Sequence, residues 1–334
     1  MLGTIRFFLA LIVALGHANV RIAGLNPGVM SVVCFYLISG YVMTSLIRAH
    51  YLALPRVPHF YLDRGLRIYP QYLLIVAMTL AWYFLGQPNS YFLGHAPQWG
   101  DVLNNFSVVP LNYYMFNGSD QFTLIPPAWS LGAELQFYVL LPLLLLWRLR
   151  SLAFMVGIAV FAAAAAGMIN SELYGYRLLP GVLTFFLLGS ILYDWREQRR
   201  GLVLLIVTLV TVIGAAIFLQ QSGHLGLPYN RETLLGLAIG LPLLYIFGRM
   251  PQQALDNRLG DLSFGVFLNH FLIQWTVTGV PQTPAGWLLY LTLSIALSAA
   301  TQWLVERPVL AWKRRLRGKA PALMTASMSP AQSR

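Results

Sequence analysis

The sequence contains little charge and almost no cysteine. Only 10% of the 334 residues are charged and 57% are hydrophobic, whereas about a quarter of a soluble domain is charged. No aqueous fold could hide that much apolar surface, so an ordinary soluble domain is excluded. Cys34 is the single cysteine. An intrachain disulfide framework and a cysteine metal site are therefore excluded as well.

Several short motifs are also missing. There is no Gly-x-Ser-x-Gly turn, no glycine-rich phosphate loop and no Asp/Glu/His spacing typical of a metal site. We therefore expect no metal. The net charge of +11 could suggest nucleic acid, but the basic residues lie in short loops between apolar segments and form no continuous patch. Membrane topology explains them better, so we expect no nucleic-acid partner.

Long apolar segments recur along the whole chain, each long enough to cross a hydrocarbon core of ~30 Å. They predict an all-α polytopic transmembrane bundle embedded in a lipid bilayer, with about ten spans. The expected spans are about 4–20, 28–47, 68–86, 128–147, 151–169, 176–193, 202–219, 232–247, 262–280 and 285–304. Residues 1–315 would form the membrane domain and 316–334 a disordered cytoplasmic tail.

An even number of spans places both termini on one side. The loops on that side hold most arginines, whereas the opposite loops hold only Arg21, Arg177 and Arg231. By the positive-inside rule, both termini are expected in the cytoplasm. A plasma membrane, in bacteria the inner membrane, is the expected location. One long outer connection, Gln87 to Pro127, is rich in aromatic residues; we expect either an ordered lid or substrate platform, with an interfacial helix around Val102 to Phe116, or a re-entrant plug.

The first expected span, "IRFFLALIVALGH", carries Arg6 at one end and His17 at the other. Eleven helical steps turn through roughly 1100°, so the two side chains lie on one stripe about 16 Å apart along the axis. Ionisable groups are costly inside a membrane and are therefore candidates for a functional site. The segment presents one basic group near the cytoplasm and one imidazole toward the outer surface.

Two further spans contain ionisable candidates. Ser130, Glu134 and Tyr138 are spaced i, i+4, i+8 and share a helix face. Glu134 is expected at a depth similar to His17, where the two could form a catalytic pair or only a buried packing contact. His270 lies within another span; for this lone histidine, packing and catalysis remain open.

The loop before the third expected span reads "FYLDRGLRIYPQY". Arg64 and Arg67 are three residues apart and would project from neighbouring faces of one turn. Two guanidinium groups at the cytoplasmic surface suit a phosphate ligand. Simple topological anchoring is the alternative.

Taken together, these stretches resemble the acyltransferase 3 family of integral-membrane O-acyltransferases. The Arg6 to His17 segment is similar to its Arg-x10-His motif, "CFYLISGY" to its Phe-rich Ser-Gly motif and "RGLRIYPQY" to its Arg-x-x-Arg-Ile-x-Pro motif. "WSLGAELQFY", with Trp129, matches a further motif throughout, and "SFGVFLNH" and "VERP" resemble the last two. Asp63 departs from a common arginine, and Phe264 and Phe267 from tyrosines.

The resemblance implies that acetyl-coenzyme A, or a related acyl-coenzyme A, binds from the cytoplasm. Arg6, Arg64 and Arg67 would hold its phosphates. His17 would deprotonate the acceptor hydroxyl, with Glu134 orienting the imidazole and His270 as a further catalytic candidate. Trp129, Ser130 and Tyr138 would bind substrate. The acceptor would be a glycan, a lipid-linked sugar or a small hydroxylated molecule.

A different class of function stays open at this point. In a proton-coupled transporter or flippase, buried His and Glu side chains relay protons and arginines bind a substrate phosphate or a lipid-linked substrate. No inverted repeat is visible in the sequence, which weakens this interpretation.

Overall fold

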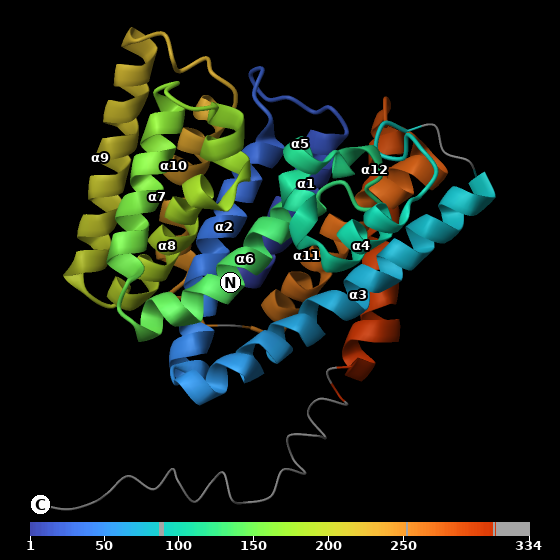
Figure 1. The fold of residues 1–334 in the computed structure, drawn as a ribbon, viewed down its shortest axis with the longest axis horizontal. Helices are drawn as coiled ribbons and strands as arrows, with labels where there is room; N and C mark the ends of the chain where they lie inside the picture. The colour runs from blue at the N-terminus through green and yellow to red at the C-terminus, as the bar shows by residue number, and fades with distance from the viewer. Residues whose placement is uncertain (87–89, 252, 310, 312–334) are drawn as a thin grey trace, which may run out of the picture.

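The apolar segments form α-helices at every expected place (Figure 1). A computed structural model describes residues 1–86, 90–251, 253–309 and 311. Ten main helices follow the expected spans: α1 Leu2–His17, α2 Pro27–Leu46, α3 Val57–Gly86, α6 Ala128–Leu146, α7 Arg150–Ala165, α8 Leu179–Trp195, α9 Arg199–Gln221, α10 Asn230–Phe247, α11 Ala254–Ile273 and α12 Pro284–Thr301. Two short helices, α4 Trp99–Ser107 and α5 Tyr114–Asn117, lie in the long connection. The described residues contain no strand, so the all-α class is confirmed for them.

Six helices in the described part of the chain are long and apolar enough to cross a membrane. α1 and α7 are apolar but shorter. α10 and α11 carry charged residues near their N-terminal ends, among them Glu232 and Asp256. The count of ten spans and the cytoplasmic termini therefore stay predictions, and the expected tail 316–334 lies outside the described residues.

α8 lies between α2 and α9, and α9 lies at one edge of the bundle (Figure 1). Only 11% of the most apolar window of α9 is buried, against 78% for the segment that contains α8. A helix that is apolar on all sides and is not covered by the rest of the protein suits a lipid environment. α2 and α8 approach closely because Gly40 packs on the Phe186 carbonyl and Gly189 on that of Leu37; a Cβ at either glycine would lie within 2 Å of those oxygens.

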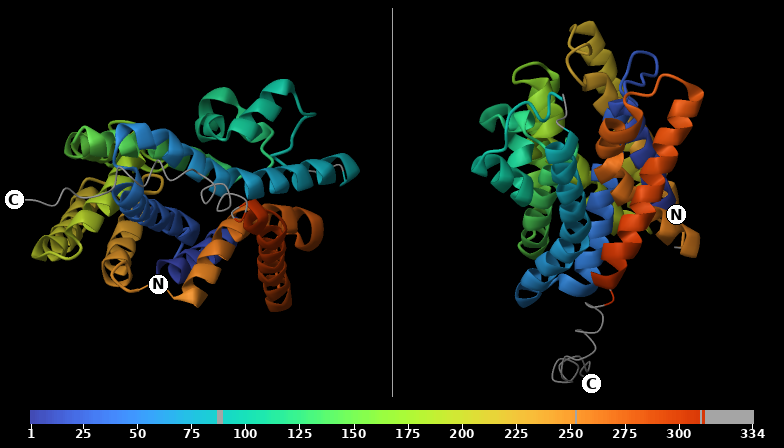
Figure 2. Two further views of the ribbon diagram at one scale, coloured as in Figure 1. Left: turned by 90° about the horizontal axis from the view of Figure 1, so that it is seen from below. Right: turned by 90° about the vertical axis from the view of Figure 1, so that its right-hand side faces the viewer.

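The helix α3 differs from its expected span of 68–86, because it begins at Val57. Pro58 suits the first turn of a helix, where its missing N–H has no intrahelical partner. Pro70 lies inside the helix, which continues through it. The helix runs obliquely beside the bundle (Figures 1 and 2). Arg64 and Arg67 thus lie within a helix rather than in a loop before one.

The helices α1 and α11 pack side by side in the same direction. Near the start of α1, the Thr4 backbone N–H donates to the Asp256 carboxylate at 2.8 Å, and Gly3 packs on the backbone of α11. At the opposite end, His17 contacts His270. This parallel pairing brings two histidines 253 residues apart in sequence into contact.

The long connection is ordered over its described residues and packs on α6. Asn105 donates to the carbonyls of Asp101 and Phe122 and accepts from the N–H of Leu124. Asn112 donates to the carbonyls of Trp129 and Arg177. Buried asparagines thereby satisfy backbone groups that no regular element pairs. This arrangement favours the expected platform.

Topology gives a direct prediction. In a Cys34→Ser background, Phe116→Cys in the exposed part of the connection should react with a membrane-impermeant thiol reagent added to intact cells, whereas Arg199→Cys should react only after the membrane is opened. Phe116 is 64% exposed in the structure, so labelling is not limited by burial. Labelling of Arg199→Cys in intact cells would contradict the cytoplasmic orientation.

Candidate active site

Three cavities lie in series between the helices. The first, here the arginine cavity, has a volume of about 270 Å³ and is lined by Arg6, Arg64 and Arg67. The second, the aromatic cavity, has about 340 Å³ and includes His17, Trp129 and Arg177 in its wall. A junction cavity of about 30 Å³ shares Val32, Ser130 and Phe267 with the first and His17, Asn26 and Trp129 with the second. The junction cavity thus has wall residues in common with each of the two larger spaces.

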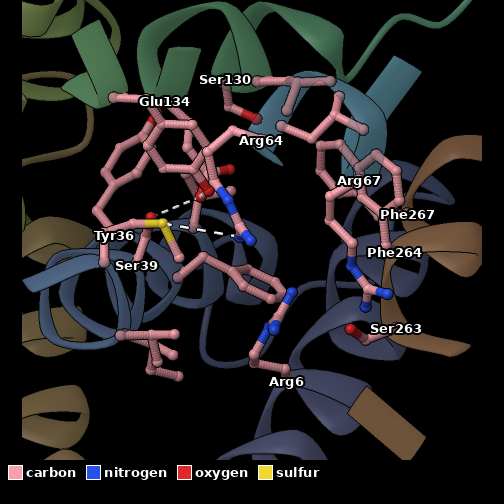
Figure 3. Close-up of a pocket in the computed structure, with 18 residues that line it drawn as sticks. Arg6, Tyr36, Ser39, Arg64, Arg67, Ser130, Glu134, Ser263, Phe264 and Phe267 are labelled. Atoms are coloured by element: carbon pink, nitrogen blue, oxygen red, sulfur yellow. Dashed lines mark hydrogen bonds between the residues drawn. The ribbon is translucent and has the colours of Figure 1, made fainter. Parts of the chain in front are cut away.

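The arginine cavity collects basic side chains from two helices. Arg6 comes from α1, Arg64 and Arg67 from α3, and all three point into the same space (Figure 3). Among the described residues, Arg6 has no hydrogen-bond partner. Arg64 pairs with Asp63, one of the three residues at which the sequence departs from the family pattern that it resembles. Phe264 and Phe267 add apolar surface to the wall.

Arg67 is held differently from the other two arginines. Its guanidinium donates to the carboxylates of Glu306 and Asp261, the latter at 2.7 Å. Glu306 is buried, and it belongs to the segment "VERP". The charge of Arg67 is therefore already compensated, so a phosphate would have to compete with two carboxylates for it.

Glu134 lies in the wall of the arginine cavity together with Ser130 and Tyr138, as their common helix face predicts. Its carboxylate accepts hydrogen bonds from the Ser39 hydroxyl at 2.5 Å and from the Tyr138 hydroxyl at 2.6 Å. The expected pairing of Glu134 with His17 is wrong. Similar depth along two helices does not place two side chains on facing sides, and the face of α6 that carries Glu134 turns toward the arginines.

His17 pairs instead with His270. The His17 Nδ1 and His270 Nε2 atoms are 3.0 Å apart, and the ring planes lie within 5° of each other. The His270 Nδ1 lies 3.1 Å from the Val266 carbonyl oxygen, which can only accept. In the neutral rings, His270 therefore carries its proton on Nδ1 and accepts from His17 Nδ1–H. This leaves His17 Nε2 with a free lone pair.

One guanidinium group, that of Arg177, lies in the wall of the aromatic cavity. Arg177 lies over the rings of Trp129 and Tyr114, 4.9 and 5.2 Å from their centroids, and bonds Glu172 at 2.7 Å. Burial raises the pKa of Tyr114 to about 12, so its phenol stays neutral at physiological pH. Trp129 packs against Tyr176 in an edge-to-face arrangement. Residues of the long connection, Tyr91 and Asp120 among them, complete the wall.

Sequence reasoning did not identify Ser39, Asn26, Tyr176 or Arg177 as site residues. Ser39 lies in the quoted Ser-Gly stretch and Arg177 in a loop with few charges, whereas Asn26 precedes Pro27 as a helix N-cap signal. None of these local signals indicates a cavity. Within the described residues, no three His, Cys, Asp or Glu side chains gather as metal ligands do.

Comparison with known proteins identifies the family of this chain. A family model described as an acyltransferase domain matches residues 2–304. The chain belongs to the acyltransferase 3 family. It is therefore a multi-pass membrane acyltransferase that transfers groups other than aminoacyl groups. Family membership favours this function over the transporter alternative.

The relatives differ in how much of this acyltransferase they cover. It is 37% identical over 187 residues to an uncharacterized protein of Aquifex aeolicus, covering 54% of the chain and 84% of that protein. Nodulation protein 10 of Rhizobium leguminosarum bv. viciae is 26% identical over 317 residues, which is 85% of this chain and 82% of the relative. The O-acetyltransferase OatA of Staphylococcus aureus is 27% identical over 155 residues, 45% of this chain and 25% of OatA. No solved structure matches the chain significantly.

Proposed function

We propose that this protein moves an acyl group, acetyl by default, from cytoplasmic acyl-coenzyme A to a hydroxyl of a glycan or another exported acceptor. The observation that carries the proposal is the series of cavities, with His17 in the wall of both the junction and the aromatic cavity. A charged, phosphate-bearing donor and a hydroxylated acceptor can thus approach one imidazole from two sides of the bundle. We place the protein in the plasma membrane, in bacteria the inner membrane, with residues 1–315 as the catalytic membrane domain.

The donor would occupy the arginine cavity. Arg6 offers forked N–H donors to its phosphates, and Arg64 does so with one carboxylate, Asp63, beside it. Arg67, held by both Glu306 and Asp261, shapes the wall and binds phosphate more weakly. The extended pantetheine arm would run along α1 toward the junction, past Glu134, whose carboxylate can accept an N–H from an amide of the arm. The junction, at about 30 Å³, is much smaller than either cavity beside it, which favours acetyl over long acyl chains.

The acceptor would enter the aromatic cavity. The rings of Trp129, Tyr176 and Tyr114 gather around Arg177 in its wall. Aromatic surface of this kind suits the apolar parts of a sugar, and the polar groups beside it suit its hydroxyls. Polysaccharides, lipid-linked sugars and small hydroxylated metabolites all present such a group. The O-acetyltransferase relative supports an O-linked product.

The chemical step follows from the histidine pair. The acceptor oxygen attacks the thioester carbonyl carbon while His17 Nε2 takes the hydroxyl proton. His270 holds His17 in the required tautomer through its Nε2 lone pair. The tetrahedral oxyanion then collapses, the carbon–sulfur bond breaks, and the coenzyme leaves as a thiol after taking the proton back from His17.

The proposal is tested with purified protein in detergent or in proteoliposomes. Incubation with acetyl-coenzyme A should release free coenzyme A, slowly by hydrolysis and faster when a suitable hydroxylated acceptor is added. A protein that consumes no thioester but moves a phosphate-bearing solute across the vesicle membrane would overturn the proposal in favour of transport.

Donor binding gives a second prediction. Arg64→Lys and Arg6→Lys should each raise the KM for acetyl-coenzyme A roughly tenfold with little change in kcat, because the lost forked contact acts equally in the ground and transition states. Arg67→Lys should have a smaller effect. Arg48→Lys is the matched control, since Arg48 pairs with Asp194 outside the cavity. Unchanged donor KM in both variants would mean that the arginines only anchor the protein in the membrane.

A further inference from the structure

The junction cavity contains a polar side chain that the proposed reaction has not yet used. Asn26 lies in the wall of both the junction cavity and the aromatic cavity, in each case together with His17. It also lies against Gly16, the residue before His17. A Cβ at Gly16 would lie 2.6 Å from the Asn26 Oδ1, so only glycine lets the two segments meet there.

Hydrogen bonding fixes the orientation of the Asn26 amide. Asn26 is the N-cap of α2, and its Oδ1 accepts the Gly28 N–H at 2.9 Å. Because a backbone N–H can only donate, the oxygen of the amide must be the atom that faces it. The Asn26 backbone N–H is used as well, donating to Glu232 of α10 at 3.3 Å.

The amide nitrogen of the Asn26 side chain takes no part in these hydrogen bonds. Among the described residues, Asn26 Nδ2 has no hydrogen-bond partner, and the side chain is only half-buried. The Ser130 hydroxyl, in the same wall, already donates to the Pro127 carbonyl at 3.0 Å. The Asn26 amide thus has two unused N–H groups in a side chain that lines the junction together with His17, and its oxygen is held by the cap of α2.

We propose that Asn26 Nδ2 is the oxyanion donor of the acyl transfer. When the acceptor oxygen bonds to the thioester carbon, the carbonyl π electrons move to its oxygen, which becomes an anion until the carbon–sulfur bond breaks. A preorganised amide N–H beside His17 stabilises that charge. Because it forms in the junction, the same contact serves hydrolysis and transfer. This inference rests on the proposed function, in which His17 is the base.

The experiment separates the role of Asn26 as a hydrogen-bond donor to the oxyanion from its role as the N-cap of α2. Asn26→Ser and Asn26→Asp keep a side-chain oxygen that caps α2, since both residues are good N-caps, but neither places an amide N–H in the junction. We expect kcat for acetyl-coenzyme A hydrolysis to fall roughly 100-fold in Asn26→Ser. It should fall further in Asn26→Asp, whose negative charge opposes the oxyanion. The KM for acetyl-coenzyme A and the melting temperature should stay close to those of the parent.

A matched control is available at another helix. Thr283 caps α12 by accepting the Gly286 N–H at 3.1 Å, away from all three cavities. Thr283→Ala removes a cap without touching the site and should leave kcat unchanged. An equal loss of activity and melting temperature in Thr283→Ala and the Asn26 variants would assign Asn26 a folding role and overturn the proposal.

Two other results would also overturn it. Near-parental hydrolysis in both Asn26→Ser and Asn26→Asp would mean that no oxyanion contact is lost. A loss confined to Tyr176→Phe, which removes the hydroxyl of another residue in the junction wall, would transfer the role to Tyr176. Failure of the proposed function looks different, because His17→Gln would then retain activity whatever the Asn26 variants do.

Discussion

Replacing His17 by glutamine should abolish most acyl transfer while leaving the protein folded and able to bind the donor. Turnover should fall by roughly 10²–10⁴-fold, the usual contribution of a general base. Glutamine has a similar size and can still donate to His270, but its amide cannot accept and carry a proton at neutral pH. In the proposed complex the donor phosphates bind near Arg6, about 16 Å from His17 along α1, so donor affinity should persist.

The measurement combines single-turnover release of coenzyme A with equilibrium binding of acetyl-coenzyme A to the same preparation. His59→Gln serves as the control, because His59 is exposed on α3 and lines none of the three cavities. If His17→Gln keeps near-normal turnover, His17 is a packing residue and the base must be sought at His270 or Glu134.

His270 should matter almost as much, although in the proposed step it does not touch the substrate. His270→Ala removes the acceptor for His17 Nδ1–H and frees His17 to adopt the other tautomer, in which Nε2 carries the proton and cannot act as a base. Removing the orienting partner of a catalytic histidine costs up to about 10⁴-fold in a serine protease. We expect a fall of roughly 10²–10⁴-fold here, with the donor KM unchanged.

A conservative variant distinguishes orientation from packing. The amide of His270→Gln can accept from His17 through its oxygen and donate to the Val266 carbonyl through its nitrogen, so it should restore a measurable part of the activity that His270→Ala lacks. Asn269→Ala is the neighbouring control, since Asn269 donates to the Ser294 carbonyl at 3.0 Å and has no bond to His17. Full activity in His270→Ala would rule out the positioning role.

The sequence by itself determined the class of the protein and the position of its helices. So many apolar segments of this length cannot all be hidden from water in a soluble fold. In lipid, a helix is the simplest way for one segment to satisfy its own backbone hydrogen bonds. Periodicity within one helix is also local. For this reason the sharing of one face by Ser130, Glu134 and Tyr138, and the position of Arg6 and His17 on one stripe about 16 Å apart along the axis, followed from spacing alone.

Contacts between helices were decided only by the tertiary structure. Depth along two helices can be estimated from sequence, but the rotation of each helix and the choice of its neighbours depend on packing across the whole bundle. Glycines at Gly3 and Gly260 bring α1 against α11, and this pairing gives His17 the partner His270 instead of Glu134.

The charge partners of Arg67 and the position of Asn26 were likewise decided only by contacts between distant segments. Nothing near Arg67 in the chain indicates that Asp261 and Glu306 compensate its charge, because these carboxylates lie 194 and 239 residues away in the sequence. Asn26 is recognisable in the sequence only as a helix cap. Its place beside His17 exists because Gly16 allows α1 to touch the start of α2, and such a contact depends on two surfaces that no single segment describes.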